Sequence, residues 1–213
     1  MRAGVTSVVL AGVAGQPVLE TARVLAQAAL SAGLDVSFSE CPSPLACGGS
    51  VSAHVRFGEE VRSPLVGEGG ADVLVGFEQL EALRAGRLLS PHGVAAVGER
   101  LVPTWRMRAG LEPAPDVIGR LRAVTPRVVS VPVEALVQPI GGERYVGLAL
   151  LGLLSPLLPL PEGAYLAALR ASPGADLAAR CLALARGREL FASLPERVAV
   201  ATLHPLDIAG ARR

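Results

Sequence analysis

The chain has 213 residues, of which 51% are hydrophobic and 18% are charged, so it is long enough and apolar enough to bury one large core. Its 20 basic and 19 acidic residues leave a net charge of +1, which excludes the broad electrostatic attraction that nucleic acids and anionic membranes exploit. We therefore expect neither of these as a partner.

The N-terminal part predicts a strand, a turn and a helix. Residues 5–11 form a continuous apolar run, typical of a strand that is buried on both faces. Helical spacing of apolar residues follows from Pro17 until Gly33. Because the apolar run continues into this helical pattern, we expect a buried strand and not a signal peptide.

The following pattern predicts further strands at 35–39, 50–57, 72–76, 93–97 and 127–131, with helices at 77–85 and 116–123. The turn at 58–60 predicts a hairpin that continues at Val61. In the helix at 77–85 we expect Leu80 and Leu83 to face inward, and Glu78, Glu81 and Arg84 to face outward. Segment 102–115 holds three prolines and the only tryptophan, and we interpret it as a connection.

After Pro132 the pattern predicts helices alone, at about 143–154, 161–171 and 175–192. The predicted fold class is α/β, a Rossmann-like three-layer sandwich over residues 1–135 with a C-terminal helical arm over 136–213. This arm is expected to pack on the same domain or on a partner. Its segment 145–160 is the most apolar of the chain but too short to span a membrane, and it predicts a partner interface.

Two glycine-containing loops are candidate binding sites. Residues 12–17, Gly-Val-Ala-Gly-Gln-Pro, stand where a dinucleotide-binding fold places its phosphate turn, but Ala14 and Pro17 replace two of the three glycines in the template. A tight turn without a ligand is the alternative. Gly48-Gly49, directly before a strand, indicates positive φ or the close approach of another backbone or a ligand.

The remaining candidates for chemistry are single residues. Cys47 is either a reactive thiol or simply a small residue, and His54 is either a catalytic imidazole or, more in keeping with a polar strand face, a solvated or capping side chain. The three cysteines lack Cys-x-x-Cys spacing, which favours a reduced, cytoplasmic protein without disulfide, zinc or iron–sulfur site. With no nucleophile elbow or Walker loop, the sequence predicts no catalytic residue in this chain.

Four segments together resemble a known family. They are Val-Val-Leu-Ala-Gly-Val-Ala-Gly-Gln at 8–16, Gly-Gly-Ser-Val-Ser-Ala-His-Val-Arg-Phe-Gly at 48–58, Ser-Pro-Leu at 63–65, and the run from Gly70 to Arg84. The chain resembles the gamma domain of 2-oxoacid:ferredoxin oxidoreductases, and its length and helical end are most similar to the small beta subunit of indolepyruvate ferredoxin oxidoreductase.

The resemblance implies a subunit that carries no cofactor itself and packs on a large 2-oxoacid oxidoreductase subunit holding thiamine pyrophosphate and iron–sulfur clusters. That complex would decarboxylate a 2-oxoacid oxidatively and pass electrons to ferredoxin, so we expect a hetero-oligomer, or a homodimer when the chain is isolated. The loops expected to face a ligand or an interface contain Gly12, Gly15, Gln16, Cys47, Gly48, Gly49 and Ser50.

The chain departs from the family pattern in both loops. The family's turn typically reads Gly-x-Gly-Gly-Gln-Gly, where this chain has Ala14 and Pro17, and Cys47 stands in the place of an arginine before the glycine pair. A thiol cannot replace the planar, five-donor guanidinium. The alternatives are therefore a degenerate member that acts as a non-enzymatic binding or assembly protein, and a stand-alone nucleotide-binding oxidoreductase.

Overall fold

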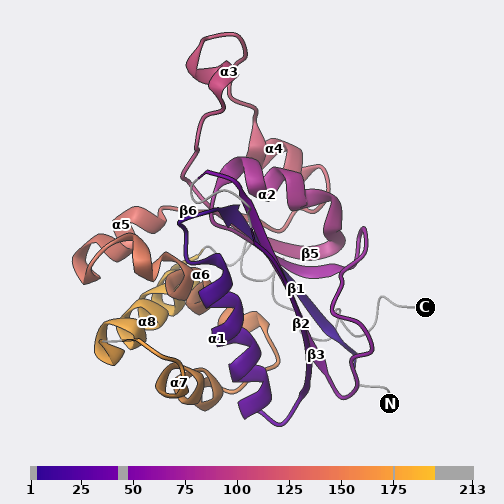
Figure 1. Cartoon of the computed structure of the whole chain (residues 1–213), viewed down its shortest axis with the longest axis vertical. Coiled ribbons are helices and arrows are strands. Elements are labelled where there is room, and N and C mark those ends of the chain that lie inside the picture. The colour runs from indigo at the N-terminus through magenta and orange to yellow at the C-terminus, as the bar shows by residue number, and fades with distance from the viewer. Residues whose placement is uncertain (1–3, 43–47, 175, 195–213) are drawn as a thin grey trace.

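The computed structural model describes residues 4–42, 48–174 and 176–194 (Figure 1). The strands in these ranges are β1 (Thr6–Val13), β2 (Asp35–Cys41), β3 (Ser50–Gly58), β4 (Ala71–Gly76), β5 (Leu89–Gly98) and β6 (Val128–Val131). The α-helices are α1 (Val18–Ser31), α2 (Gln79–Ala85), α3 (Trp105–Arg108), α4 (Val117–Arg122), α5 (Val133–Val137), α6 (Val146–Leu154), α7 (Glu162–Ala171) and α8 (Leu177–Ser193). Short 3-10 turns lie at Gly86–Leu88, Gln138–Ile140, Glu143–Tyr145 and Ser155–Leu157.

The described strands form one mixed six-stranded sheet in the order β2-β3-β1-β4-β5-β6. β1 pairs in antiparallel fashion with β3, with Thr6 opposite Phe57 and Val13 opposite Ser50, and in parallel with β4. β5 and β6 continue in parallel, and β2 is antiparallel to β3. Consequently β1, β4, β5 and β6 all end at one edge of the sheet, and β3 begins there.

Helices cover both faces of this sheet (Figure 1). Successive residues of β1 point to opposite faces: Val8 and Leu10 belong to the core under α1, α6, α7 and α8, whereas Val9 belongs to the core under α2 and α4. This arrangement confirms the predicted three-layer α/β fold.

The C-terminal helices pack on the same body as the sheet. All nine residues of α6 are buried, between α1 and α8, and α7 lies against α1. The α6 and α8 backbones are in close contact, because a Cβ at Gly152 would lie 2.0 Å from the Leu184 carbonyl oxygen. The prediction that 145–160 forms a partner interface is therefore wrong, because the apolar side chains of this segment are covered within the chain. The division predicted at residue 135 falls inside α5 and stays a prediction.

Two further expectations are wrong. No strand begins at Val61 to form the expected hairpin; β3 instead pairs with β2, which precedes it, and with β1. Glu78 and Glu81 do not face outward, since they are only 1% and 4% exposed. The cause is the hydrogen bonding of their carboxylates, described below. By contrast, Asp116 caps α4 as expected, with its side chain accepting from the Gly119 N–H.

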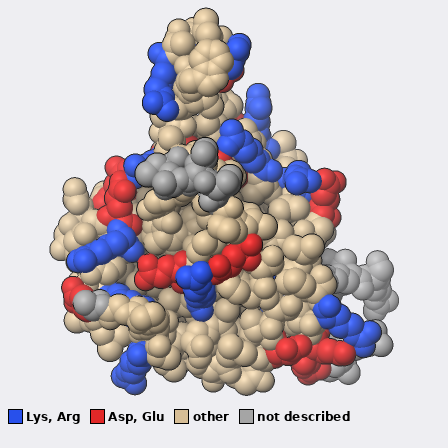
Figure 2. Space-filling view, in the orientation of Figure 1, with Lys and Arg blue, Asp and Glu red and all other residues tan. Residues whose placement is uncertain are grey.

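Residues 102–115, which we call the α3 loop, leave the sheet after β5 and return to α4 (Figure 1). They are a connection, as predicted, apart from the four residues of α3. The loop projects from the body, and basic side chains flank it in the space-filling view (Figure 2).

Candidate functional site

The strand ends at the common edge also mark the point where the chain changes face. α1 follows β1 on one face, and α2 follows β4 on the other. In open α/β sheets, ligands and partners bind in the crevice beyond the carboxyl ends of the strands at such a switch point. The candidate site is therefore the group of loops that follow β1, β4 and β5 and precede β3.

Gln16 joins the two strand ends that flank the switch point. Its amide oxygen accepts from the Val13 N–H at 2.9 Å, and its amide nitrogen donates to the Phe77 carbonyl at 3.2 Å. The side chain thus links the β1–α1 turn to the residue after β4. Both ends of the amide are engaged within the chain, so in this structure Gln16 holds the shape of the site and does not present its amide to the outside.

The predicted glycines of the β1–α1 turn have separate reasons to be glycine. A Cβ at Gly12 would lie 2.6 Å from the Gln16 amide oxygen and 2.9 Å from Cβ of Phe77, so a side chain would displace the bridge. Gly15 has φ +99, which side chains rarely adopt, and a Cβ there would meet open space. Neither Ala14 nor Pro17 is strained, and Pro17 stands immediately before α1, where its missing N–H costs little.

The Gly48-Gly49 pair lies directly against this turn. The Ala14 N–H donates to the Gly49 carbonyl at 2.8 Å, and the Gly48 N–H donates to the Ala14 carbonyl at 3.5 Å. Gly48 has φ +72. Both features expected from the sequence, positive φ and the approach of another backbone, are present. Cys47 lies outside the described residues.

Two buried glutamates complete the edge, and the sequence analysis missed their role. The Glu78 carboxylate caps α2 by accepting from the Glu81 N–H at 2.9 Å, and its other oxygen accepts from the Val102 N–H at 2.8 Å. The Glu81 carboxylate accepts from the Ser50 hydroxyl and pairs with Arg84. A carboxylate two positions after a buried strand and three residues before a second carboxylate was the available signal of a helix cap.

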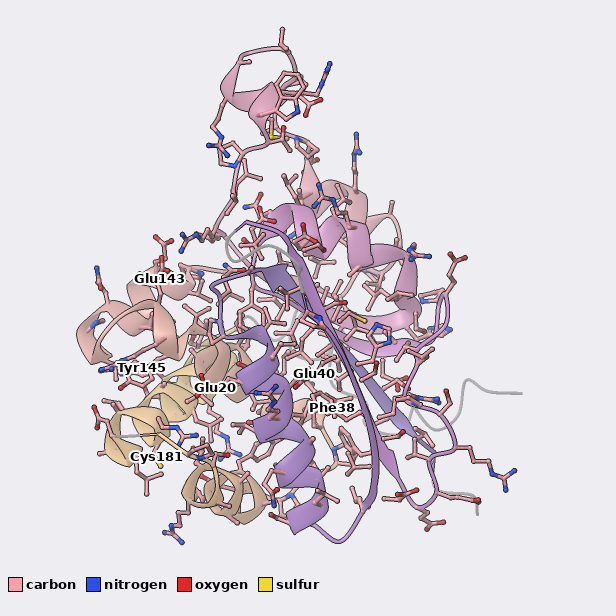
Figure 3. All side chains as sticks on the ribbon, viewed as in Figure 1. Glu20, Phe38, Glu40, Glu143, Tyr145 and Cys181 are labelled. Atoms are coloured by element: carbon pink, nitrogen blue, oxygen red, sulfur yellow. The ribbon has the colours of Figure 1, made fainter. Side chains whose placement is uncertain are left out.

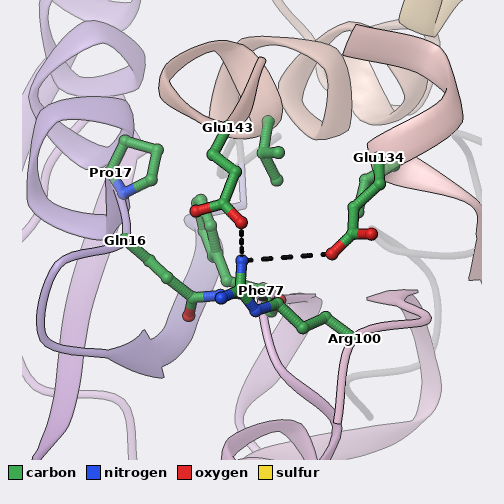
Figure 4. Close-up of a pocket in the computed structure, with 8 residues that line it drawn as sticks. Gln16, Pro17, Phe77, Arg100, Glu134 and Glu143 are labelled. Atoms are coloured by element: carbon green, nitrogen blue, oxygen red, sulfur yellow. Dashed lines mark hydrogen bonds and ion pairs between the residues drawn. The ribbon is translucent and has the colours of Figure 1, made fainter. Parts of the chain in front are cut away.

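A small pocket opens beside Gln16, on the face that carries α1 (Figure 4). Arg100 reaches into it from the end of β5, pairs with Glu143 and lies 4.0 Å from Glu134. Pro17 and Phe77 supply apolar walls. With two carboxylates around one guanidinium, the charged side chains of the pocket sum to −1, so it is not an anion site.

His54, the other candidate for chemistry, lies away from this edge, opposite Val9 in the middle of β1. His54 is half-buried on β3, and its Nδ1 accepts from the Val66 N–H at 3.0 Å, which matches the capping role. Burial lowers the pKa of His54 from its ordinary value. Cys41, at the end of β2, and Cys181, on α8 (Figure 3), are free thiols on different elements. The described residues contain no group of three potential metal ligands, and none of their helices has the length and hydropathy of a membrane span.

Comparison with known proteins decides the family. A family model described as pyruvate ferredoxin/flavodoxin oxidoreductase matches residues 7–190, most of the chain. The chain belongs to this family. Among its relatives in this oxidoreductase family, indolepyruvate oxidoreductase subunit IorB of Archaeoglobus fulgidus is 36% identical over 160 residues, which cover 74% of this chain and 79% of the relative. The subunit of the same name from Thermococcus kodakarensis is 35% identical, covering 73% of this chain and 80% of the relative.

Solved structures of the oxidoreductase family share the fold. The keto/oxoacid ferredoxin oxidoreductase gamma subunit from Geobacter sulfurreducens superposes with a TM-score of 0.65 at 20% identity, covering 94% of this chain and 99% of that one. A 2-oxoglutarate:ferredoxin oxidoreductase from Magnetococcus marinus gives a TM-score of 0.66 at 19% identity. The match covers 90% of this chain but 32% of that chain, so there the fold is part of a much longer polypeptide.

Proposed function

We propose that this chain is the small subunit of an indolepyruvate:ferredoxin oxidoreductase, which decarboxylates a 2-oxoacid oxidatively in a complex with a large subunit. The observation that carries this proposal is the 36% identity over 160 residues to an indolepyruvate oxidoreductase subunit. The proposal extends to a cytoplasmic location and to ferredoxin as the electron acceptor of the complex.

Thiamine pyrophosphate and the iron–sulfur clusters are assigned to the large subunit. The described part of this chain offers no fit for a cluster, because Cys41 and Cys181 lie on separate elements and no group of three ligands gathers. The carboxylates at the edge, Glu78 and Glu81, already accept hydrogen bonds from within the chain. This chain supplies the switch-point edge of the sheet as a binding surface for the partner. Gln16, Glu78 and Glu81 hold the loops of that edge in place.

One observation supports the alternative of a non-enzymatic assembly protein. Ala14 and Pro17 remove two glycines of the family's turn, and Cys47 removes a guanidinium. Contacts that active relatives would make through this turn and this guanidinium are then absent here, while Ala14 and the Gly48-Gly49 pair still hydrogen-bond to each other. Under this alternative the chain binds the large subunit without supporting turnover.

The proposal is tested by reconstitution. The chain and the large oxidoreductase subunit of the same organism are purified anaerobically, separately and together, and dye reduction is measured with indolepyruvate, pyruvate and 2-oxoglutarate. We expect a colourless isolated chain and indolepyruvate-dependent reduction only when both subunits are present. A brown or yellow isolated chain with stoichiometric iron or flavin contradicts the cofactor assignment. A stable complex that turns over none of the three acids favours the assembly protein.

Two variants sharpen this test. Gln16→Ala removes the bridge between the strand ends, and we expect it to reduce both assembly and dye reduction. The matched control is Gln27→Ala, a glutamine within α1 itself, which should leave both unchanged. Cys47→Arg restores a guanidinium, worth about 1.5–3 kcal/mol where the contact geometry is present, so it is expected to raise activity roughly ten- to hundredfold. An unchanged Cys47→Arg complex indicates that this loop does not face the reacting groups.

A further inference from the structure

The α3 loop, residues 102–115, carries an exposed apolar tip. Trp105, the only tryptophan of the chain, is 67% exposed, and Leu111 is 59% exposed. Trp105 is the most exposed of the large hydrophobic side chains in the described residues. Tryptophan is among the residues most enriched at binding hot spots, so its exposure on a projecting loop points to a partner.

This tip is held rigidly by contacts inside the loop. Thr104 caps α3 by accepting from the Met107 N–H, and its hydroxyl donates to Glu112 at 2.9 Å. Arg106 pairs with Glu112 at 3.0 Å and lies 5.5 Å from the centre of the Trp105 ring. A preorganised tip loses little conformational entropy on binding.

The end of α3 fixes the backbone between the two apolar residues. The Gly110 N–H donates to the Met107 carbonyl and the Leu111 N–H to the Arg106 carbonyl, the bonding pattern of a Schellman motif, with Gly110 at φ +70. In this motif the residue after the glycine folds back toward the last turn of the helix. Leu111 thus follows directly on the short helix that begins at Trp105, so both exposed apolar residues belong to one hydrogen-bonded segment.

The surroundings of the tip are positively charged. Residues 102–122 contain four arginines (106, 108, 120 and 122) and two acidic residues, Glu112 and Asp116. Arg108 donates to the Pro103 carbonyl and has no carboxylate within ion-pair distance in the described part of the chain. The whole chain carries only +1, so this loop and helix concentrate positive charge. A matching surface has an apolar pocket with an acidic rim.

The base of the loop is joined to the candidate site. Glu78 accepts from the Val102 N–H with one carboxylate oxygen and caps α2 with the other, next to the contact between Glu81 and Ser50. The base of the α3 loop is therefore adjacent to the switch-point edge. A symmetric contact between two copies through their α3 loops is disfavoured, since it would bring two positively charged loops together.

We infer that the α3 loop is an anchor that inserts Trp105 and Leu111 into an acidic-rimmed apolar pocket of the large oxidoreductase subunit. This inference rests on the proposed function. The loop lies beside the switch-point edge, so the anchor gives the large subunit an apolar contact next to the loops that are proposed to face it.

The test measures the dissociation constant between this chain and the large subunit by biolayer interferometry. Trp105→Ala is expected to weaken binding about 30-fold or more, the effect of removing an aromatic hot spot, and Leu111→Ala to weaken it about fivefold or more. Leu65→Ala is the matched control, a leucine 60% exposed elsewhere on the surface, and it should bind as the wild type does. Arg108→Gln should slow association and reduce its dependence on salt.

A second measurement follows the wild-type sequence. Because the chain has one tryptophan, 5-fluorotryptophan labelling gives a single fluorine resonance, whose shift between H₂O and D₂O reports exposure of the ring. We expect this solvent shift to disappear on addition of the large subunit and to persist at every concentration of the chain alone. Loss of the shift in the chain alone, as concentration rises, makes a second copy the occupant and overturns the inference.

The outcomes separate the anchor from the proposed function. If the wild type forms the complex but Trp105→Ala binds equally well and the fluorotryptophan stays exposed, the anchor is refuted while the proposed function stands. If the wild type does not bind the large subunit at all, both fail.

Discussion

The close contact between α6 and α8 allows us to calculate how far one added methyl group, in Gly152→Ala, lowers the free energy of unfolding. In Gly152→Ala the new Cβ would lie 2.0 Å from the Leu184 carbonyl oxygen, whereas ordinary contact begins at 3.4 Å, so the helices must move apart by about 1.4 Å at this point. Backbone cannot rotate away as a flexible side chain can. Overpacking of this kind costs about 3 kcal/mol, from which the better helix propensity of alanine subtracts about 1 kcal/mol. The net loss is about 2 kcal/mol.

Thermal unfolding followed by circular dichroism measures this loss. For a chain of this length about 2 kcal/mol lowers Tm by roughly 4–8 °C. Gly163→Ala in α7 is the control, because a Cβ at Gly163 has no atom within 4 Å, and we expect it to raise Tm by about 1–3 °C through helix propensity alone. A Gly152→Ala chain that unfolds at or above the wild-type Tm would refute the close helix contact.

Three further changes probe the edge of the sheet and its surroundings. Glu78→Gln should lower the free energy of unfolding, measured in urea, by about 1.5–3 kcal/mol, because an amide cannot accept both backbone N–H groups as a carboxylate does. The control is Glu20→Gln, an exposed substitution in the first turn of α1, which should have little effect. Burial lowers the folded-state pKa of His54, so its stabilising contribution is complete above the unfolded-state pKa of about 6.5 and is lost as pH falls toward the folded-state pKa. His54→Gln should flatten this part of a pH–stability curve, and a curve identical to that of the wild type would contradict the assignment. Asp116→Ala, which removes the cap of α4, should cost about 1 kcal/mol in the same urea experiment.

Much of the fold could be predicted because its signals are local. The apolar run of β1, the helical spacing after Pro17 and the cap at Asp116 depend on neighbouring residues only. The Gly48-Gly49 pair was equally informative: its glycines indicated the close backbone that Ala14 provides, although the sequence did not identify Ala14.

The errors concern residues whose environment is decided by distant partners. Glu78 and Glu81 were placed in water because charged residues are usually exposed. Their burial depends on Val102 and Ser50, which lie 24 and 31 residues away along the chain. The apolar segment around α6 was assigned to a partner interface because hydrophobicity alone does not say which surface covers it. Here α1 and α8 cover it, and only the packed chain reveals this.

The packing of α7 and α6 on α1 also has a consequence for synthesis on the ribosome. α1 is translated early, but the helices that cover its outer face, α6 and α7, leave the exit tunnel only after the six described strands. Until then a nascent chain can pair β1 with β3 and β4 while one apolar face of α1 stays uncovered. Such exposure makes incomplete chains prone to aggregate. A premature stop codon anywhere before α7 therefore releases a fragment that tends to aggregate, and not a smaller folded domain.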